Sequence, residues 1–232
     1  DRTVQIARIV THAILDELET AKLKTSVFHL VSVIQEAAGK GVAIFLQDNP
    51  DPDAIASGCA LKRIAEKYHI KSTIYYGGNI GRQQNKILVD LLETDLIQLK
   101  TADEALEIAH AADKVALIEA SIPSKNNILP LQITPHIVID HHETDFSLVK
   151  GEFIEILPKI GATSTILTRY LRHLDIVPDP PLATALRYGI RVDTGGFTRN
   201  TTMEDLDAAA YLSPLLDAGL LNQIENPPMS AE

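Results

Sequence analysis

Three aspartates lie within six residues of one segment, and their spacing is typical of a site for a hard divalent cation. The segment directly follows the short apolar run Val42–Leu46, which indicates a buried strand, and it reads Gln47-Asp48-Asn49-Pro50-Asp51-Pro52-Asp53. Carboxylates this close repel one another unless a cation or protons intervene, and open α/β folds bind ligands at the carboxyl ends of strands. The same segment also fits a plain turn, with an aspartate capping a helix that starts near Ala54. Both interpretations remain open on this segment alone.

A second polar group, Asp140-His141-His142, follows the apolar run Ile137–Ile139 in the same way. Adjacent side chains diverge at a strand end, so we expect the two histidines to have different roles. One would bind metal and the other would face a substrate, while Asp140 orients a ring through a hydrogen bond. A histidine pair by itself is commonly a surface feature, but the repeated placement after an apolar run favours a site.

Two further acids follow the same pattern. Glu119 ends the apolar run Val115–Ile118, and Asp193 lies in the segment Arg191–Phe197, which contains two glycines. Each acid alone fits an ordinary polar strand end or turn. In combination with the first two groups, they extend a recurring arrangement of acids beside apolar segments.

The elements that position these residues alternate between apolar runs and amphipathic stretches. The expected strands are Val42–Leu46, Thr73–Tyr76, Val115–Ile118 and Ile137–Ile139. The expected helices are Val4–Leu18, Val27–Ala38, Ala54–Tyr68, Ala162–His173, Pro181–Ile190 and Met203–Ala218. This alternation predicts an α/β fold, a mostly parallel β-sheet flanked by helices with an N-terminal helical segment. We divide the chain into that helical segment at 1–40, a main domain at 41–222, and the start of a linker at 223–232, where Asn226, Pro227 and Pro228 resist regular structure.

Composition limits the classes of function. The 232 residues are 45% hydrophobic, enough for one large domain, and the formal net charge of −10 argues against a face for duplex DNA. Cys59 is the single cysteine, which excludes an internal disulfide and a thiolate zinc cluster. No apolar run approaches the roughly 18 residues that span a bilayer. We therefore expect a soluble, cytoplasmic protein without a membrane partner.

The four motifs, in this order, resemble those of the DHH phosphoesterases, which include RecJ-like nucleases, oligoribonucleases and manganese-type inorganic pyrophosphatases. The resemblance spans Val42 to about Leu216. Its motifs correspond to Gln47–Asp53, Glu119-Ala120-Ser121, Asp140-His141-His142 and Asp193-Thr194-Gly195. It implies a catalytic domain that normally precedes a second, substrate-selecting domain, which we expect to be absent from this chain.

The resemblance also implies two Mn²⁺ ions, with Mg²⁺ as the alternative. One ion would bind Asp51, the other would bind Asp53, His141 and Asp193, and Glu119 would bridge them. His142, supported by Asp140, would face the scissile phosphate. Three further residues are candidates for contact with phosphate, Thr163 and Ser164 at the start of a helix and Arg199. A plain helix cap by Thr163 or Ser164 is equally consistent with the sequence.

Two positions depart from the family pattern. Gln47 stands where a histidine is usual, and Glu119 stands where an aspartate is usual. A glutamine offers only a neutral amide oxygen, so we expect the first metal site to be the weaker one. The expected function is hydrolysis of a phosphodiester or phosphomonoester in a small nucleotide or short oligonucleotide by metal-activated hydroxide. An inorganic pyrophosphatase and a catalytically degenerate nucleotide-binding module are the alternatives, and self-association into a homodimer is a further expectation.

Overall fold

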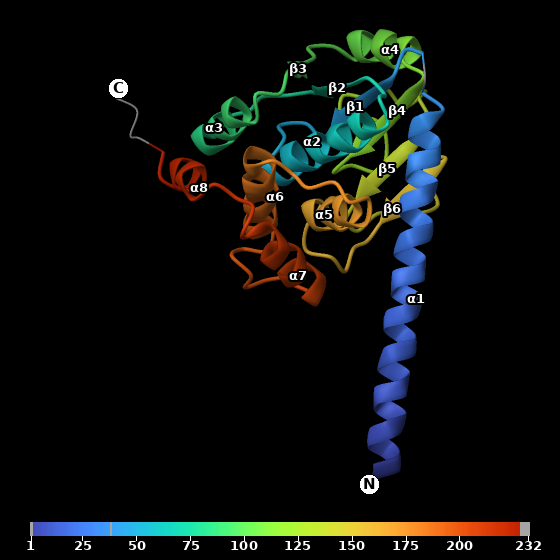
Figure 1. The fold of residues 1–232 in the computed structure, drawn as a ribbon. Helices are drawn as coiled ribbons and strands as arrows, with labels where there is room; N and C mark the ends of the chain where they lie inside the picture. The colour runs from blue at the N-terminus through green and yellow to red at the C-terminus, as the bar shows by residue number, and fades with distance from the viewer. Residues whose placement is uncertain (1, 38, 228–232) are drawn as a thin grey trace.

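The computed structural model describes residues 2–37 and 39–227, without the side chains of residues 2, 3, 6–9, 12 and 16. Figure 1 shows a single twisted sheet with helices packed around it. The strands are β1 (Val42–Leu46), β2 (Ser72–Tyr76), β3 (Leu96–Gln98), β4 (Lys114–Ile118), β5 (Ile137–Asp140) and β6 (Phe153–Ile156). The helices are α1 (Arg2–Gln35), α2 (Pro52–Lys67), α3 (Gln83–Leu92), α4 (Ala102–Ala111), α5 (Thr163–His173), α6 (Pro180–Asp193), α7 (Met203–Leu212) and α8 (Ala218–Glu225).

The six strands have the order β3-β2-β1-β4-β5-β6, and every neighbouring pair is parallel. The chain builds outward from β1 in one direction and from β4 in the other, so the strand order reverses between these two central strands. This switch point is where open parallel sheets bind ligands. The predicted parallel sheet flanked by helices is confirmed.

The register of the central strands brings three of the candidate residues level. Leu46 of β1 pairs with Ile118 of β4, and Ile118 pairs with Ile139 of β5. Gln47, Glu119 and Asp140 are each the next residue along their strands. They therefore lie side by side at the carboxyl end of the sheet.

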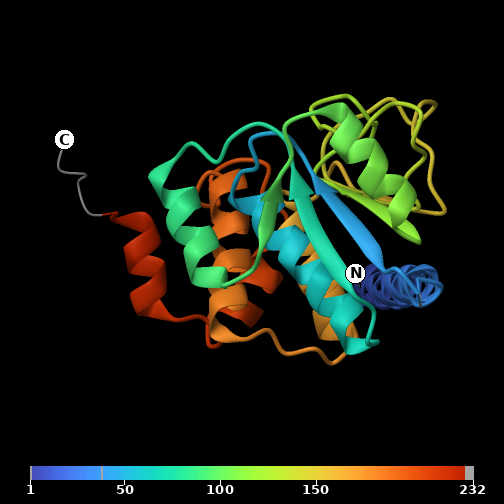
Figure 2. The ribbon, with the colours of Figure 1, turned by 90° about the horizontal axis from the view of Figure 1, so that it is seen from above.

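Alternation along β1 divides the core into two layers. Val42, Ile44 and Leu46 face the larger cluster, which is covered by α1, α2, α3, α5 and α6, and Ala43 and Phe45 face a smaller cluster under α4. Figure 2 shows α4 on the opposite side of the sheet from α2, α5 and α6. Burial of all five β1 residues explains the unbroken apolar run in the sequence.

Two sequence expectations about helices are wrong. The separate helices Val4–Leu18 and Val27–Ala38 are one helix of 34 residues, because no glycine or proline interrupts the chain before Gly39. The expected helix Met203–Ala218 ends instead at Leu212, just before Ser213 and Pro214, and α8 follows it with Asp217 as its cap. Pro214 has no N–H group to continue the helical hydrogen bonds, so the helix stops before it.

The helices at the two ends of the described chain also extend further than the sequence suggested. Helix α8 continues to Glu225, past residue 222 where we expected the linker to begin, and Pro228 lies outside the described residues. At the other end, the first half of α1 projects away from the rest of the protein (Figure 1). Within residues 2–37 and 39–227, every helix is too short or too polar to cross a lipid bilayer.

Candidate metal centre

Glu119 is a buried carboxylate that accepts no hydrogen bond from the described residues. Its backbone N–H continues the strand ladder by donating to Ile139, and the chain then turns away because Glu119 has the left-handed φ of 59°. The residue is 1% exposed, and neither carboxylate oxygen accepts a hydrogen bond from the described residues. Burial, with added repulsion from Asp53, Asp51 and Asp140, raises the pKa of Glu119 well above its usual value. A strained backbone and a buried carboxyl group without a hydrogen bond are both costly, so they indicate a functional position.

His141 directs one ring nitrogen at this carboxylate. Its Nε2 lies 3.7 Å from Glu119 Oε1, 3.1 Å from Asp193 Oδ2 and 4.0 Å from Asp53 Oδ2. Its Nδ1 lies 3.1 Å from the carbonyl oxygen of Ile160, which fixes Nδ1 as a donor and leaves Nε2 for the site. Burial lowers the pKa of His141, but the nearby carboxylates outweigh it and raise the pKa to about 9.

Asp53 is anchored at the amino terminus of α5. The backbone N–H groups of Thr163 and Ser164 donate to Asp53 Oδ2 and Oδ1, each at 2.7 Å. This carboxylate is fully buried, and burial together with repulsion from Asp193 raises its pKa. The N–H groups of Thr163 and Ser164 are therefore already engaged by Asp53, and contact of these two residues with a substrate phosphate stays a prediction. The cap position is Ala162, so neither side chain is the cap.

Close packing of α6 against α2 and α5 brings Asp193 next to Asp53, Glu119 and His141. Gly189 of α6 lies against α2 and α5, where an added Cβ would stand 2.7 Å from Ser164 Oγ and 3.1 Å from Asp53 Cα. One ligand atom each from Asp53, Glu119, His141 and Asp193 lies within 4.8 Å of the others. A mixed set of carboxylates and one imidazole suits Mn²⁺. These four residues, which we call the central cluster, fit a divalent cation.

Asp51 and Gln47 lie beside the central cluster. Asp51 Oδ1 caps α2 by accepting from Ala54 at 2.9 Å, so the turn interpretation of this segment is also correct. Asp51 Oδ2 accepts from Gln47 Nε2 at 3.0 Å, and Gln47 Oε1 accepts from Asn126 at 3.0 Å. These contacts hold the Gln47 side chain beside the central cluster. A second metal bound by Asp51 and Gln47 stays a prediction.

His142 borders a cavity of about 120 Å³ next to the central cluster. Its Nδ1 lies 2.9 Å from Asp140 Oδ1, and its backbone N–H donates to the same oxygen at 3.0 Å. This contact with Asp140 is the main cause of a raised pKa of His142. The side chain is half exposed, while Asp140 is buried. A protonated ring in this position would present a positive, hydrogen-bonding edge to an anion in the cavity.

Residues 41–190 match the DHH family, N-terminal domain. The chain belongs to the DHH family. It is 39% identical over its whole length to the uncharacterised protein MJ1633 of Methanocaldococcus jannaschii, covering 49% of that protein. It is 29% identical to a probable manganese-dependent inorganic pyrophosphatase of Deinococcus radiodurans, with 75% of this chain and 54% of the relative aligned. The cyclic-di-AMP phosphodiesterase GdpP of Bacillus subtilis is 24% identical, with 91% of this chain and 30% of the relative aligned.

A solved structure has the same fold. The exopolyphosphatase-related protein from Bacteroides fragilis superposes with a TM-score of 0.72 at 18% identity, covering 90% of this chain and 62% of that one. This DHH chain spans about half or less of the length of the curated relatives named above.

Arg199 and Lys125 differ in their relation to the DHH site. Arg199 is exposed and its side chain packs against Gly195, two residues after Asp193, so its contact with phosphate stays a prediction. Lys125, one of several basic residues near the motifs, lines the same cavity as His142. Lys125 is therefore better placed than Arg199 to contact a phosphate in that cavity.

Sequence reasoning missed Asp205 of α7. Asp205 is fully buried, and it accepts hydrogen bonds from the backbone N–H of Gly161 at 3.0 Å and from Thr165 Oγ1 at 2.6 Å. Asp205 therefore holds the turn whose Ile160 carbonyl orients His141. An added Cβ at Gly161 would stand 2.6 Å from the Asn200 carbonyl oxygen, so this turn requires glycine. Nothing in the local sequence around Asp205 signals this support.

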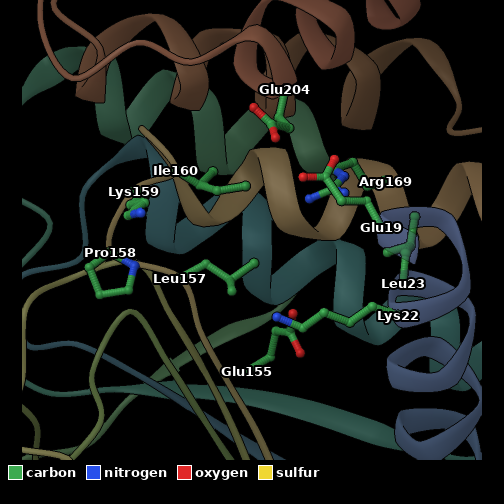
Figure 3. Close-up of a pocket in the computed structure, with 10 residues that line it drawn as sticks. All are labelled: Glu19, Lys22, Leu23, Glu155, Leu157, Pro158, Lys159, Ile160, Arg169 and Glu204. Carbon is green, nitrogen blue, oxygen red and sulfur yellow. The ribbon is translucent and has the colours of Figure 1, made fainter. Parts of the chain in front are cut away.

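A larger cavity of about 360 Å³ lies away from the DHH site, between α1, α5 and the loop after β6 (Figure 3). Its charged lining mixes signs, with Lys22 and Arg169 beside Glu19 and Glu155. It contains no cluster of metal-ligating side chains among the described residues. The smaller cavity, which adjoins the central cluster, is therefore the candidate site.

Proposed function

We propose that this DHH domain hydrolyses a phosphodiester or phosphomonoester bond in a small nucleotide or short oligonucleotide, with Mn²⁺ as its cofactor. The observation that carries the proposal is Glu119, a buried carboxylate whose two oxygens accept no hydrogen bond from the described residues and whose nearest cationic groups are the rings of His141 and His142, each at 3.7 Å. A resident cation compensates such a charge, whereas a purely structural site would pair it with donors.

The central cluster would hold the ion, and its four residues have distinct tasks. Glu119 and Asp193 supply carboxylate oxygens on either side of His141, whose Nε2 faces the same point. Asp53 adds a third carboxylate that α5 keeps in place. When bound, a divalent cation here would lower the pKa of a water molecule and stabilise negative charge on phosphate oxygens.

The neighbouring cavity would receive the phosphate. His142 donates from its ring when Asp140 holds it protonated, and Lys125 adds a positive charge on the same lining. Both groups stabilise anionic oxygens of a phosphoester through charge-assisted hydrogen bonds. Attraction at this point offsets the long-range repulsion expected from a chain of net charge −10.

The substrate class rests on the named relatives. GdpP and a further relative, PdeA of Listeria monocytogenes, are named as cyclic-di-AMP phosphodiesterases, and one relative is named as an inorganic pyrophosphatase, each with 24–29% identity to this chain. We favour a nucleotide over pyrophosphate because longer alignments, 91% and 78% of this chain against 75%, join it to the two phosphodiesterases. Hydrolysis of pyrophosphate is the second candidate function.

A panel of substrates tests the proposal. Cyclic-di-AMP, a short RNA, 3′-phosphoadenosine 5′-phosphate and pyrophosphate would each be incubated with the protein and Mn²⁺, and products would be resolved by chromatography. We expect turnover of at least one nucleotide, lost in Asp193→Asn and absent with EDTA. Turnover of pyrophosphate alone would select the second candidate. No turnover, combined with wild-type Mn²⁺ binding measured by calorimetry, would indicate a binding module in place of an enzyme.

A further inference from the structure

The amino-terminal half of α1 carries apolar side chains that the rest of the chain leaves uncovered. Helix α1 has 34 residues, and its packing on the domain involves the carboxy-terminal part, where Val27, Leu30 and Ile34 are fully buried. Towards the other end Ile14 is 52% exposed and Leu18 is 61% exposed. Figure 1 shows this half extending away from the sheet and the other helices. A lone helical segment of this length is marginal in water, so the projecting half needs a covering surface.

The uncovered face lies opposite the face that packs on the domain. At about 100° per residue, Val27, Leu30 and Ile34 centre on one side of the helix, and Ile14 and Leu18 centre on the side nearly opposite. A partner that binds along Ile14 and Leu18 would therefore not collide with the domain of the same chain.

The exposed residues follow a heptad repeat. With Val4 at position a, the a and d positions also include Thr11, Ile14, Leu18, Ala21, Thr25 and Phe28. Among the described side chains of α1, the six large apolar residues that are exposed all take core or flanking positions in this register. They are Val4 at a, Val10 at g, Ile14 at d, Leu15 at e, Leu18 at a and Phe28 at d. Apolar a and d positions with flanking e and g positions are the pattern of a coiled-coil seam. We call this face the α1 seam.

The charges beside the α1 seam identify the partner as a second copy of the same chain. In a parallel, in-register coiled coil, a g residue of one helix faces the e residue five positions later on the other. Glu17 takes a g position and Lys22 takes the following e position, and both are exposed, with Lys22 at the border between the α1 seam and the cavity that contains Glu155. A second copy thus places Glu17 opposite Lys22 of the partner subunit, and the reciprocal pair forms by symmetry. Val10 and Leu15 have the same g-to-e relation and extend the apolar contact.

We propose that two copies of this chain associate through the α1 seam as a parallel, two-stranded coiled coil, with the two domains on the outer sides. The seam from Val4 to Phe28 covers more than three heptads, and at its last position the ring of Phe28 packs edge-on against His173 of α5. Its small residues at Thr11, Ala21 and Thr25 reduce the buried apolar area, so the association is weaker than that of an all-leucine zipper.

Light scattering after size exclusion tests the association. The chain has a mass of 25.4 kDa, and the wild-type protein is expected at twice that mass. Leu18→Glu places a charge at the centre of the α1 seam in a residue type that favours helix, and it is expected to return the mass to one chain. The matched control is Val177→Glu, an equally apolar exposed position outside α1, which should remain dimeric. A monomeric wild type over a wide concentration range, or a dimeric Leu18→Glu, would overturn the proposal.

Cysteine cross-linking tests the parallel register. Cys59 is buried, so a single introduced cysteine reports alone. Ala21→Cys places a thiol at a d position, where the two chains face each other, and Ala13→Cys is the matched exposed position on another side of α1. Mild oxidation is expected to join Ala21→Cys into a covalent dimer much faster than Ala13→Cys. Equal rates, or an Ala21→Cys that stays uncrosslinked in a dimeric protein, would exclude the parallel seam.

Discussion

In the metal-free protein, Asp53→Asn tests two opposing effects of Asp53 on stability: repulsion from the neighbouring carboxylates and the hydrogen bonds that its carboxylate accepts. Crowding of acids alone predicts that removing a charge from the central cluster stabilises the fold. The structure predicts the opposite for this residue, because Asp53 accepts the N–H groups of Thr163 and Ser164 at the start of α5. An asparagine has one acceptor oxygen and one NH₂ group, so it can satisfy only one of these two donors.

The expected loss follows from that geometry. One hydrogen bond to a charged acceptor is worth about 1.5–3 kcal/mol, and a buried N–H left without a partner costs about 1–3 kcal/mol. Relief of burial and of repulsion from Asp193, the causes of the raised pKa of Asp53, acts against this loss. We expect the free energy of unfolding to fall by about 2–4 kcal/mol.

Asp51→Asn is the matched control. It removes one negative charge from the neighbouring position, and asparagine caps helices about as well as aspartate, so the contact with Ala54 is kept while the contact with the Gln47 amide is lost. That contact joins two side chains and leaves no buried backbone N–H unpaired, so the free energy of unfolding should fall by about 1 kcal/mol or less. Urea unfolding with EDTA at pH 8, followed by circular dichroism, measures both variants. Equal stabilities for the two variants would refute the anchoring role of Asp53.

Three further predictions concern protons and metal. Without metal, the melting temperature should fall as pH rises from about 5 to 9. The raised pKa values of Glu119 and Asp53 mean that the folded state holds their protons more tightly than the unfolded state, and His141 loses its stabilising charge near pH 9. A melting temperature that does not change with pH in calorimetry would contradict this. Mn²⁺ affinity should increase between pH 7 and 9 as His141 loses its proton, with proton release visible by calorimetry in buffers of different ionisation enthalpy; affinity independent of pH would exclude His141 as a ligand. Gln47→His should tighten Mn²⁺ binding, since imidazole is the better donor, whereas unchanged affinity and stoichiometry would show that residue 47 does not face the metal.

The position of the candidate residues at the ends of strands could be predicted from the sequence because the central strands are fully buried. The runs before Gln47, Glu119 and Asp140 are unbroken and apolar, and parallel pairing then brings their ends to one edge. The edge strand β6 escaped prediction because it is short and only partly buried, and β3 has only three residues. The end of α7 was predictable, since Pro214 marks it in the sequence.

Contacts between distant segments were beyond the reach of the sequence pattern. Asp53 and Thr163 are 110 residues apart, and whether a helix start binds a substrate or a neighbouring carboxylate depends on packing that local spacing does not encode. Asp205 illustrates the same limit, because its hydrogen bonds to Gly161 and Thr165 span about 40 residues or more. The cluster of Glu119, His141 and Asp193, in contrast, followed from chemistry-bearing residues placed after apolar segments.

Anomalous diffraction at the manganese edge, from crystals soaked in Mn²⁺, would locate the metal. We expect a peak surrounded by Glu119, His141 Nε2, Asp193 and Asp53, at ligand distances of about 2.0–2.3 Å as for other carboxylate and imidazole sites. Its occupancy should fall in Asp193→Asn. A strong peak at another place on the protein, or Glu119 still unpaired with Mn²⁺ in excess, would contradict the assignment of this cluster as the metal centre.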